Sequence, residues 1–268
     1  MRRVLLTVGY DGTRYGGWQR QLNALSVQQV LEEALSASCG HPVTVTGASR
    51  TDSGVHAAGQ RAHFDTTCAI PADKLPFAVN TRLPRDVRVT QGMDVPSAFH
   101  ARFLASEKTY TYRMAVGAHA SALWHRTHLH VIPPLDTPRM ERAMTQLLGR
   151  HDFAAFQAAG GTAKTTERII TDVSLTMEGS FLTFRIRGNA FLYNMVRIIV
   201  GTLLEIGRGK RDENAFQQAF LTKNRLALGV TAPPHGLELT EVCYPDAAFL
   251  QPEQIRWHQD TPSSGRTP

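Results

Sequence analysis

An arginine and an aspartate two residues apart lie in a loop that contains two glycines. The loop is GASRTDSGVHA, from Gly47 to Ala57, and the two side chains are Arg50 and Asp52. In an extended segment residues i and i+2 project to the same side, so the guanidinium could hold the carboxylate ionised and aimed outward. Such a carboxylate could act as a nucleophile. A simpler interpretation is a turn in which Asp52 bonds its own backbone, and the residues alone leave both possibilities open.

Other arginines and aromatic residues could bind nucleic acid. The segment YDGTRYGGWQRQ, residues 10 to 21, carries Arg14 and Arg20 among the aromatics Tyr10, Tyr15 and Trp18. We interpret it as an RNA-facing loop whose rings stack on bases, with packing in the core as the alternative.

Two more residues interrupt patterns that otherwise indicate packing. Arg197 lies within an apolar stripe, and is either a solvated charge or a partner for the loop at 47 to 57. Tyr110 belongs to KTYTYR, where alternation places it on one strand face with Lys108 and Tyr112. That placement alone favours a cross-strand packing role.

The charge of the chain indicates an anionic partner. Lys and Arg number 29 against 23 Asp and Glu, a net charge of +6. Only five of the 29 are lysine, which leaves 29 − 5 = 24 arginines, whose planar forks suit phosphate and base recognition. RNA, DNA or an acidic membrane surface would be attracted, although codon bias could also explain the arginine content.

Several function classes lack their signatures. No GxxxxGK[ST] or GxGxxG motif opens a helix, and no HExxH, paired CxxC or GxSxG occurs. We therefore expect no cofactor and no metal. The three cysteines are far apart and favour a reducing cytoplasm. No export signal or membrane span is apparent, so a soluble protein is expected.

The pattern of elements predicts an α+β fold made of two units with the order βαββαβ, as in ferredoxin-like and RNA-recognition (RRM-like) folds, with mainly antiparallel sheets flanked by helices. In the first unit we expect strands near 4 to 9, 43 to 48, 59 to 65 and 87 to 95, and helices after Ser26 and near 71 to 80. In the second unit we expect strands at 107 to 116, 168 to 178, 180 to 188 and 237 to 244, and helices from Thr137, over 191 to 204 and near 213 to 222. Met140, Ala143, Met144, Leu147 and Leu148 are expected to face inward.

These units suggest a division of the chain. We expect an N-terminal α/β domain at 1–98, which carries the loop 47–57, and a C-terminal α/β domain at 99–246. The junction falls within 97 to 106. Residues 247–268 are polar and rich in proline, and are expected to form a poorly ordered tail.

The loop at 47 to 57 resembles the active-site motif GxGRTDxGVHA of the TruA family of tRNA pseudouridine synthases, with Ser49 in place of the usual glycine. Similarity extends over nearly the whole chain to Pro245. It includes YDGTRYGGWQRQ, FHARF, KTYTYR, HDFAAF, NAFLYNMVRIIVG and TAPPHGLEL, in the order of the family. Together these segments make a chance match very improbable, and they imply the pseudouridine synthase fold.

The resemblance implies specific roles. Asp52 would be the nucleophile that isomerises uridine at positions 38 to 40 in the anticodon stem-loop of tRNA, without a cofactor. Tyr110 would stack on the flipped uracil and could assist proton removal from it. Arg50 would pair with Asp52 and occupy the vacated space, and Arg14, Arg20 and Arg197 are further candidates for substrate binding. The family also implies a homodimer that binds tRNA across a basic cleft.

Two other classes of protein fit part of this sequence. A non-catalytic RNA-binding protein would explain the charge and the fold equally well, but has little reason to point Asp52 into a site for phosphates. A phosphate-handling enzyme built on the segment 10 to 21 would lack a lysine anchor and a helix start at the right place.

Overall fold

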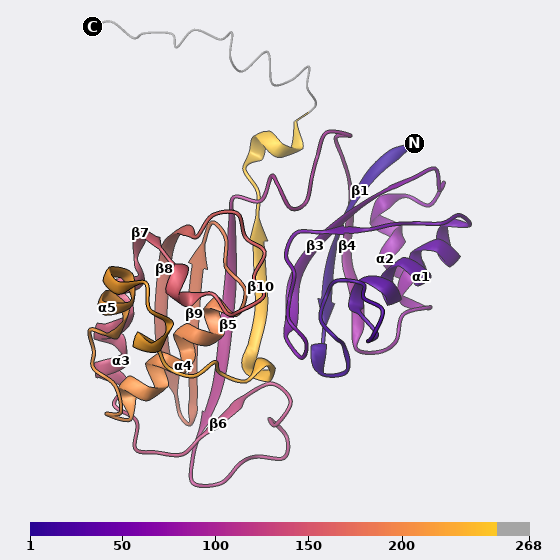
Figure 1. Cartoon of the computed structure of the whole chain (residues 1–268). Coiled ribbons are helices and arrows are strands. Elements are labelled where there is room, and N and C mark those ends of the chain that lie inside the picture. Colours follow the sequence, from indigo (N-terminus) through magenta and orange to yellow (C-terminus); the bar gives the residue numbers. More distant parts are fainter. Residues whose placement is uncertain (251–268) are drawn as a thin grey trace, which may run out of the picture.

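The computed structural model describes residues 1–250 of the 268-residue chain. In that part ten strands form one sheet, in which eight follow the order β4-β1-β3-β10-β5-β9-β8-β7, while β2 pairs with β3 and β6 with β5 (Figure 1). The strands are β1 Arg2–Tyr10, β2 Thr46–Gly47, β3 His56–Thr66, β4 Val87–Val95, β5 Glu107–Val116, β6 Leu129–Val131, β7 Gly149–Asp152, β8 Glu167–Glu178, β9 Phe181–Gly188 and β10 Leu237–Cys243. The α-helices are α1 Val27–Cys39, α2 Leu75–Asn80, α3 Thr137–Met144, α4 Met195–Gly207 and α5 Ala215–Thr222.

Each half of the sheet has the strand order of a ferredoxin-like unit. In the first half the elements run β1-α1-β2-β3-α2-β4 and the strands lie as β4-β1-β3-β2. In the second half the corresponding strands lie as β10-β5-β9-β8. Parallel pairing occurs between β10 and β3 and between β5 and β6, and the other pairs are antiparallel. The predicted fold class is therefore confirmed, with β6, β7 and α5 as additions to the second unit.

The two halves join through β3, which changes its partner along its length. At its start β3 pairs with β10, through His56 with Glu238 and Ala57 with Leu239. Further along, Ala62 pairs with Gly47 of β2. The strands β2 and β10 thus flank the same edge of β3, and the loop from 48 to 55 leaves β2 at the point where they diverge.

The helices cover the two halves separately. Figure 1 shows α1 and α2 beside the N-terminal strands and α3, α4 and α5 beside the C-terminal ones. Helix α1 begins where Ser26 Oγ accepts a hydrogen bond from the backbone N–H of Gln29 and ends at Gly40, which has a φ of 74°. The start after Ser26 was predicted from the sequence, and a glycine in the left-handed region is a common helix end. In α4 the stripe with Ile199, Leu203 and Ile206 is buried in the core of the second half.

Some boundaries differ from the sequence predictions. The strand expected over 43 to 48 is reduced to Thr46–Gly47, because the backbone N–H groups of Val43 and Val45 bond the side chains of Ser36 and Glu32 on α1. The helix expected over 191 to 204 begins only at Met195, after Asn194 at a φ of 60°. The backbone N–H groups of Val43 and Val45 therefore find their partners outside the β-sheet.

Two further expectations concern the ends of elements. Leu148 was expected to face inward, but it is 42% exposed because the helical segment has already ended and the chain turns at Gly149, with a φ of 96°. In the predicted tail, Phe249 stacks on Phe99 with ring centroids 5.6 Å apart, so packed chain continues past residue 247. The rest of that tail, 251–268, lies outside the described residues.

Candidate active site

Asp52 lies in the loop between β2 and β3 and is paired with Arg197. The Nη1 atom of Arg197 is 3.4 Å from Asp52 Oδ2, and the two side chains are 16% and 22% exposed. Burial raises the pKa of the Asp52 carboxyl above its ordinary value, while the charge and hydrogen bond of Arg197 lower it in part. The result is a carboxylate that is partly removed from water and held beside a cation.

Arg197 is itself held by the chain around it. Its Nη1 donates to Asn194 Oδ1 at 2.6 Å, and its Nε donates to the carbonyl of Ala232 at 2.8 Å. The backbone N–H of Ala232 returns a bond to the Arg197 carbonyl at 3.0 Å. Of the two alternatives for Arg197, the structure therefore shows the partner of the loop.

The expected pair of Arg50 with Asp52 is wrong in this structure. Arg50 is exposed, and within residues 1–250 its side chain makes no hydrogen bond or ion pair. Alternation along an extended segment fixes the side on which a residue projects, but it does not choose the partner. The partner comes instead from α4, 145 residues further along the chain.

The residues on either side of Arg50 point inward and anchor the loop. The hydroxyl of Thr51 is 2.8 Å from that of Tyr10. Gln60 on β3 binds both backbone groups of Ser49, with distances of 3.2 Å from the Ser49 N–H and 2.6 Å to its carbonyl. Lys108 Nζ donates to the carbonyl of Ala48 at 2.8 Å. The backbone next to Asp52 is thus fixed from β1, β3 and β5.

Tyr110 lies beside this loop, on β5. Its hydroxyl is 2.9 Å from Ser49 Oγ, and the ring of Phe191 packs edge-on with centroids 5.0 Å apart. Tyr110 is 6% exposed, and burial raises the pKa of its hydroxyl to about 12. The charge of Asp52 adds to that increase in pKa. Tyr110 therefore shares the environment of Asp52.

Strand pairing explains how Tyr110 and Tyr10 come to the same place. Tyr10 pairs with Ala57, Ala57 with Leu239, and Leu239 with Tyr110. Paired residues point to one face of a sheet, so this row carries both tyrosines to the face where the loop lies. The family-like segments at the start of β3 and in β5 thus meet across the junction of the two halves.

The aromatics of the segment 10 to 21 do not face solvent. Tyr10, Tyr15 and Trp18 are all buried, so the interpretation that they stack on RNA bases is wrong and core packing is right. Gly17, at a φ of 100°, lets this segment approach the loop closely, since a Cβ there would lie 2.4 Å from the carbonyl oxygen of Thr51. The segment 10 to 21 therefore packs directly against the loop that carries Asp52.

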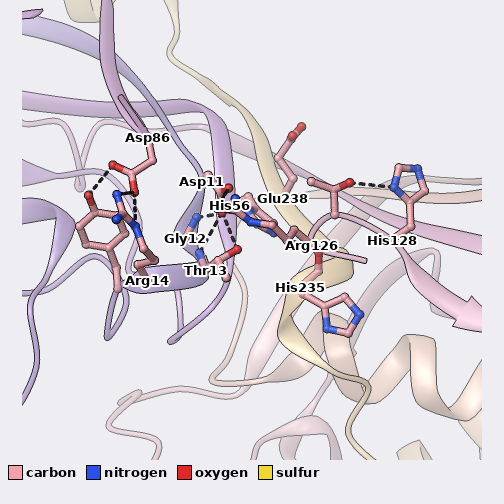
Figure 2. A network of polar contacts seen from close by, with 12 residues as sticks. Asp11, Gly12, Thr13, Arg14, His56, Asp86, Arg126, His128, His235 and Glu238 are labelled. Carbon is pink, nitrogen blue, oxygen red and sulfur yellow. Dashed lines mark hydrogen bonds and ion pairs between the residues drawn. The ribbon is translucent and has the colours of Figure 1, made fainter. Parts of the chain in front are cut away.

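Arg14 and Arg20 lie at the surface but are already paired with acids. Arg14 donates through Nε and Nη2 to Asp86 at 2.9 and 2.6 Å, and Tyr15 donates to the same carboxylate (Figure 2). Arg20 Nε is 3.3 Å from Glu32. Neither acid was predicted as a partner. Asp86 is far from Arg14 in the sequence, and Glu32 comes close to Arg20 only through helix α1.

A second polar network ties the two halves together near the loop. The backbone N–H of Gly12 donates to His56 Nδ1 at 3.0 Å, and His56 Nε2 lies 3.0 Å from the carbonyl of His235. Because Nδ1 accepts the hydrogen bond from Gly12, the proton of the imidazole is on Nε2. The 3.3 Å contact of Nδ1 with Asp11 is therefore not an ion pair of a charged imidazole. The cation that pairs with Asp11 is Arg126, whose Nη2 lies 2.5 Å from Asp11 Oδ2 (Figure 2). Sequence reasoning missed Arg126, which lies in no motif.

His56 therefore links the two halves, and His100 and His151 pack against aromatic rings, on Phe103 and Phe220. Within residues 1–250 no group of three His, Cys, Asp or Glu side chains is placed to hold a metal. In the same part of the chain no helix has the length and apolar character needed to cross a membrane.

The loop, the partly buried Asp52–Arg197 pair and the tyrosine beside it form a candidate enzyme active site. Comparison with known proteins identifies the class of enzyme. A family model described as tRNA pseudouridine synthase matches residues 6–104 and 143–245. A tRNA pseudouridine synthase A from Halalkalibacterium halodurans is 49% identical, over 88% of this chain and 90% of the relative. One from Acetivibrio thermocellus is 48% identical, over 91% of this chain and 100% of the relative.

The chain belongs to the tRNA pseudouridine synthase family. It is accordingly an isomerase that converts uridine to pseudouridine. Among solved structures, a Cbf5–Nop10–Gar1 complex matches 95% of this chain and 56% of that chain with a TM-score of 0.39 and 10% identity, a likeness too weak to carry an argument. The match to the family model does not include residues 105–142, the segment that contains Tyr110.

Proposed function

We propose that this enzyme forms pseudouridine at positions 38, 39 and/or 40 in the anticodon stem-loop of tRNA, with Asp52 as the nucleophile. The observation that carries the proposal is the partly buried Asp52, held 3.4 Å from Arg197 in a loop of the family motif. A carboxylate so placed is reactive because it has lost part of its solvation, while the adjacent cation favours its ionised form.

The reaction needs no redox step. The bond from uracil N1 to ribose C1′ breaks, the base turns, and a bond from C5 to C1′ forms. The proton leaves C5, and N1 gains one. Asp52 attacks C6 of the base or C1′ of the sugar, or stabilises charge while the glycosidic bond is broken. Atoms balance between substrate and product, so one carboxylate and a route for the proton suffice.

A base within a stem must leave the stack before Asp52 can reach it. In this proposal Tyr110 stacks on the flipped uracil, and Arg50 enters the vacated space. Support for Arg50 comes from its exposure at the rim of the loop, two residues from Asp52. Support for Tyr110 comes from its hydroxyl, whose pKa responds to the charge of Asp52.

The remaining proposals concern the molecule as a whole. Residues 1–98 and 99–246 would form two domains, each built on one half of the sheet. A homodimer would bind tRNA across a basic surface, to which Arg14 and Arg20 contribute after leaving their acids. The enzyme would work in the cytoplasm, where its tRNA substrate is found.

The target positions can be tested with three anticodon stem-loops that each contain a single uridine, at position 38, 39 or 40. We expect pseudouridine by chemical mapping in at least one of them, and none in a stem-loop whose only uridine lies in the loop at position 33. Pseudouridine that forms only outside positions 38 to 40 would contradict the proposed substrate.

A further inference from the structure

Ser49 lies three residues before Asp52 in the loop, and its side chain has a defined partner. Its Oγ lies 2.9 Å from the hydroxyl of Tyr110. Both of its backbone groups are bound by Gln60, and the carbonyl before it is bound by Lys108. Glycine at this position could keep the backbone bonds but not the bond to Tyr110.

We propose that Ser49 is a positioning residue that acts through Tyr110, by holding the phenol hydroxyl, and with it the ring, in the orientation used for turnover. The inference rests on the proposed function, because it takes Tyr110 to be the residue that contacts the flipped uracil. It adds to that site a side chain that the proposed function does not use.

The fixed backbone is what allows Ser49 to act in this way. A hydroxyl on a mobile loop would follow Tyr110 rather than hold it. Here the backbone of Ser49 is bonded on both sides to β3, so its Oγ is a stationary partner for a side chain that comes from β5. The ring of Tyr110 also contacts Phe191, at 5.0 Å between centroids. The ring is thus located by one polar and one aromatic contact.

The bond also sets the chemistry of the Tyr110 hydroxyl. When Ser49 donates to it, the phenol proton is free to point elsewhere, and the bond lowers the pKa of Tyr110 against the larger effect of burial. Without Ser49, the hydroxyl of Tyr110, a residue that is 6% exposed, would lack its partner. A buried group without a partner shifts toward any other available contact. The ring would then leave the position that the substrate requires.

A double-mutant cycle with single-turnover kinetics tests the proposal. The variants are Ser49→Ala, Ser49→Gly and Tyr110→Phe, alone and combined, with thermal melting to verify folding. Ser53→Ala is the control, because the Ser53 hydroxyl bonds the carbonyl of Tyr15 at 3.3 Å instead of Tyr110. We expect both Ser49 variants to slow the chemical step about fivefold, the effect of one net hydrogen bond, with little change in tRNA affinity.

In the Tyr110→Phe background the same Ser49 substitutions should have no further effect on the rate, whereas Ser53→Ala should have the same effect in both backgrounds. An equal loss of rate from Ser49→Ala with and without the Tyr110 hydroxyl would show a role in loop structure only and overturn the proposal. No loss at all would overturn it too. Asp52→Asn, measured in the same assay, reports separately on the proposed nucleophile.

Discussion

At the scale of single residues, the carboxylate of Asp52 lies in a partly buried loop beside a cation that comes from a distant helix. The motif placed Asp52 in a loop between strands, and the structure agrees. The cation beside it is Arg197 rather than the neighbouring Arg50. A contact between residues 145 apart depends on how α4 packs against the sheet. Local spacing contains no information about that packing. The sequence therefore left open whether Arg197 is a solvated charge or the partner of the loop.

The pair predicts how the rate depends on pH. Asp52 must be ionised to act as a nucleophile, so the single-turnover rate should fall as pH decreases through its pKa, which burial raises above the ordinary 3.8. Arg197→Gln removes the charge that lowers this pKa, so the acidic limb should move to higher pH. Arg197→Lys keeps the charge and should leave the limb near that of the wild type. A limb that does not move in Arg197→Gln would contradict this account of the pair.

The raised pKa also predicts a cost in stability. A carboxyl whose pKa is higher in the folded than in the unfolded protein binds its proton more tightly when folded, so the ionised form destabilises the fold at pH above the folded pKa. Asp52→Asn should therefore increase the melting temperature at pH 7 to 8. The increase should shrink as pH falls through the folded pKa toward 3.8. A decrease at pH 7 would show instead that the Arg197 bond outweighs the burial of the charge.

At the scale of elements, alternation and capping residues predicted most strands and helices, because those signals are local. Strands β4 and β5 have the predicted bounds, and α1 begins after Ser26 as predicted. The strand expected at 43 to 48 is short because α1 side chains bind its backbone. That competition depends on tertiary packing. The burial of Trp18 was missed for the same reason, since it packs against Gly47 on another element.

Glycines in the segment 10 to 21 provide a test at this scale. Gly17 has a φ of 100°, and a Cβ there would lie 2.4 Å from the Thr51 carbonyl oxygen. Gly17→Ala should therefore displace the loop that carries Asp52 and lower the rate at least about tenfold, in addition to a strain cost of about 1 kcal/mol or more.

Gly40→Ala is a matched control for that substitution. Gly40 has a φ of 74°, but nothing lies within 4 Å of its Cβ position. It should lose about 1 kcal/mol in free energy of unfolding and keep its rate. Equal rates for the two variants would show that Gly17 does not position the loop.

At the scale of the whole molecule, the repeated order of elements predicted two units of one kind, and the strand order in each half agrees. The way in which the halves join was not predictable from that order. It depends on parallel pairing between β3 and β10. Paired residues in these strands, such as His56 and Glu238, lie about 180 residues apart in the sequence. No periodicity within either strand specifies such a pairing. The site forms at this junction, with its loop from one half and Tyr110 and Arg197 from the other.

The charge of the molecule predicts a strong dependence of tRNA binding on salt. Each arginine that contacts a phosphate adds about one to the slope of log affinity against log salt. Arg50 makes no ion pair within residues 1–250, whereas Arg14 is bound to Asp86 at 2.6 Å. Arg50→Ala should therefore reduce the slope by nearly one, and Arg14→Ala by less. A larger reduction for Arg14 would show that it leaves Asp86 readily when tRNA binds.

The most direct test of the central claim is to measure rate and affinity together for Asp52→Asn. We predict that single-turnover pseudouridine formation falls by about 1,000-fold or more, while the Kd for tRNA stays within about threefold, because phosphate contacts supply most of the affinity. Asp94→Asn, which removes an exposed carboxylate paired with Arg2 at 2.7 Å, should change neither quantity. Pseudouridine formation by Asp52→Asn at a rate near that of the wild type would contradict the assignment of Asp52 as the nucleophile.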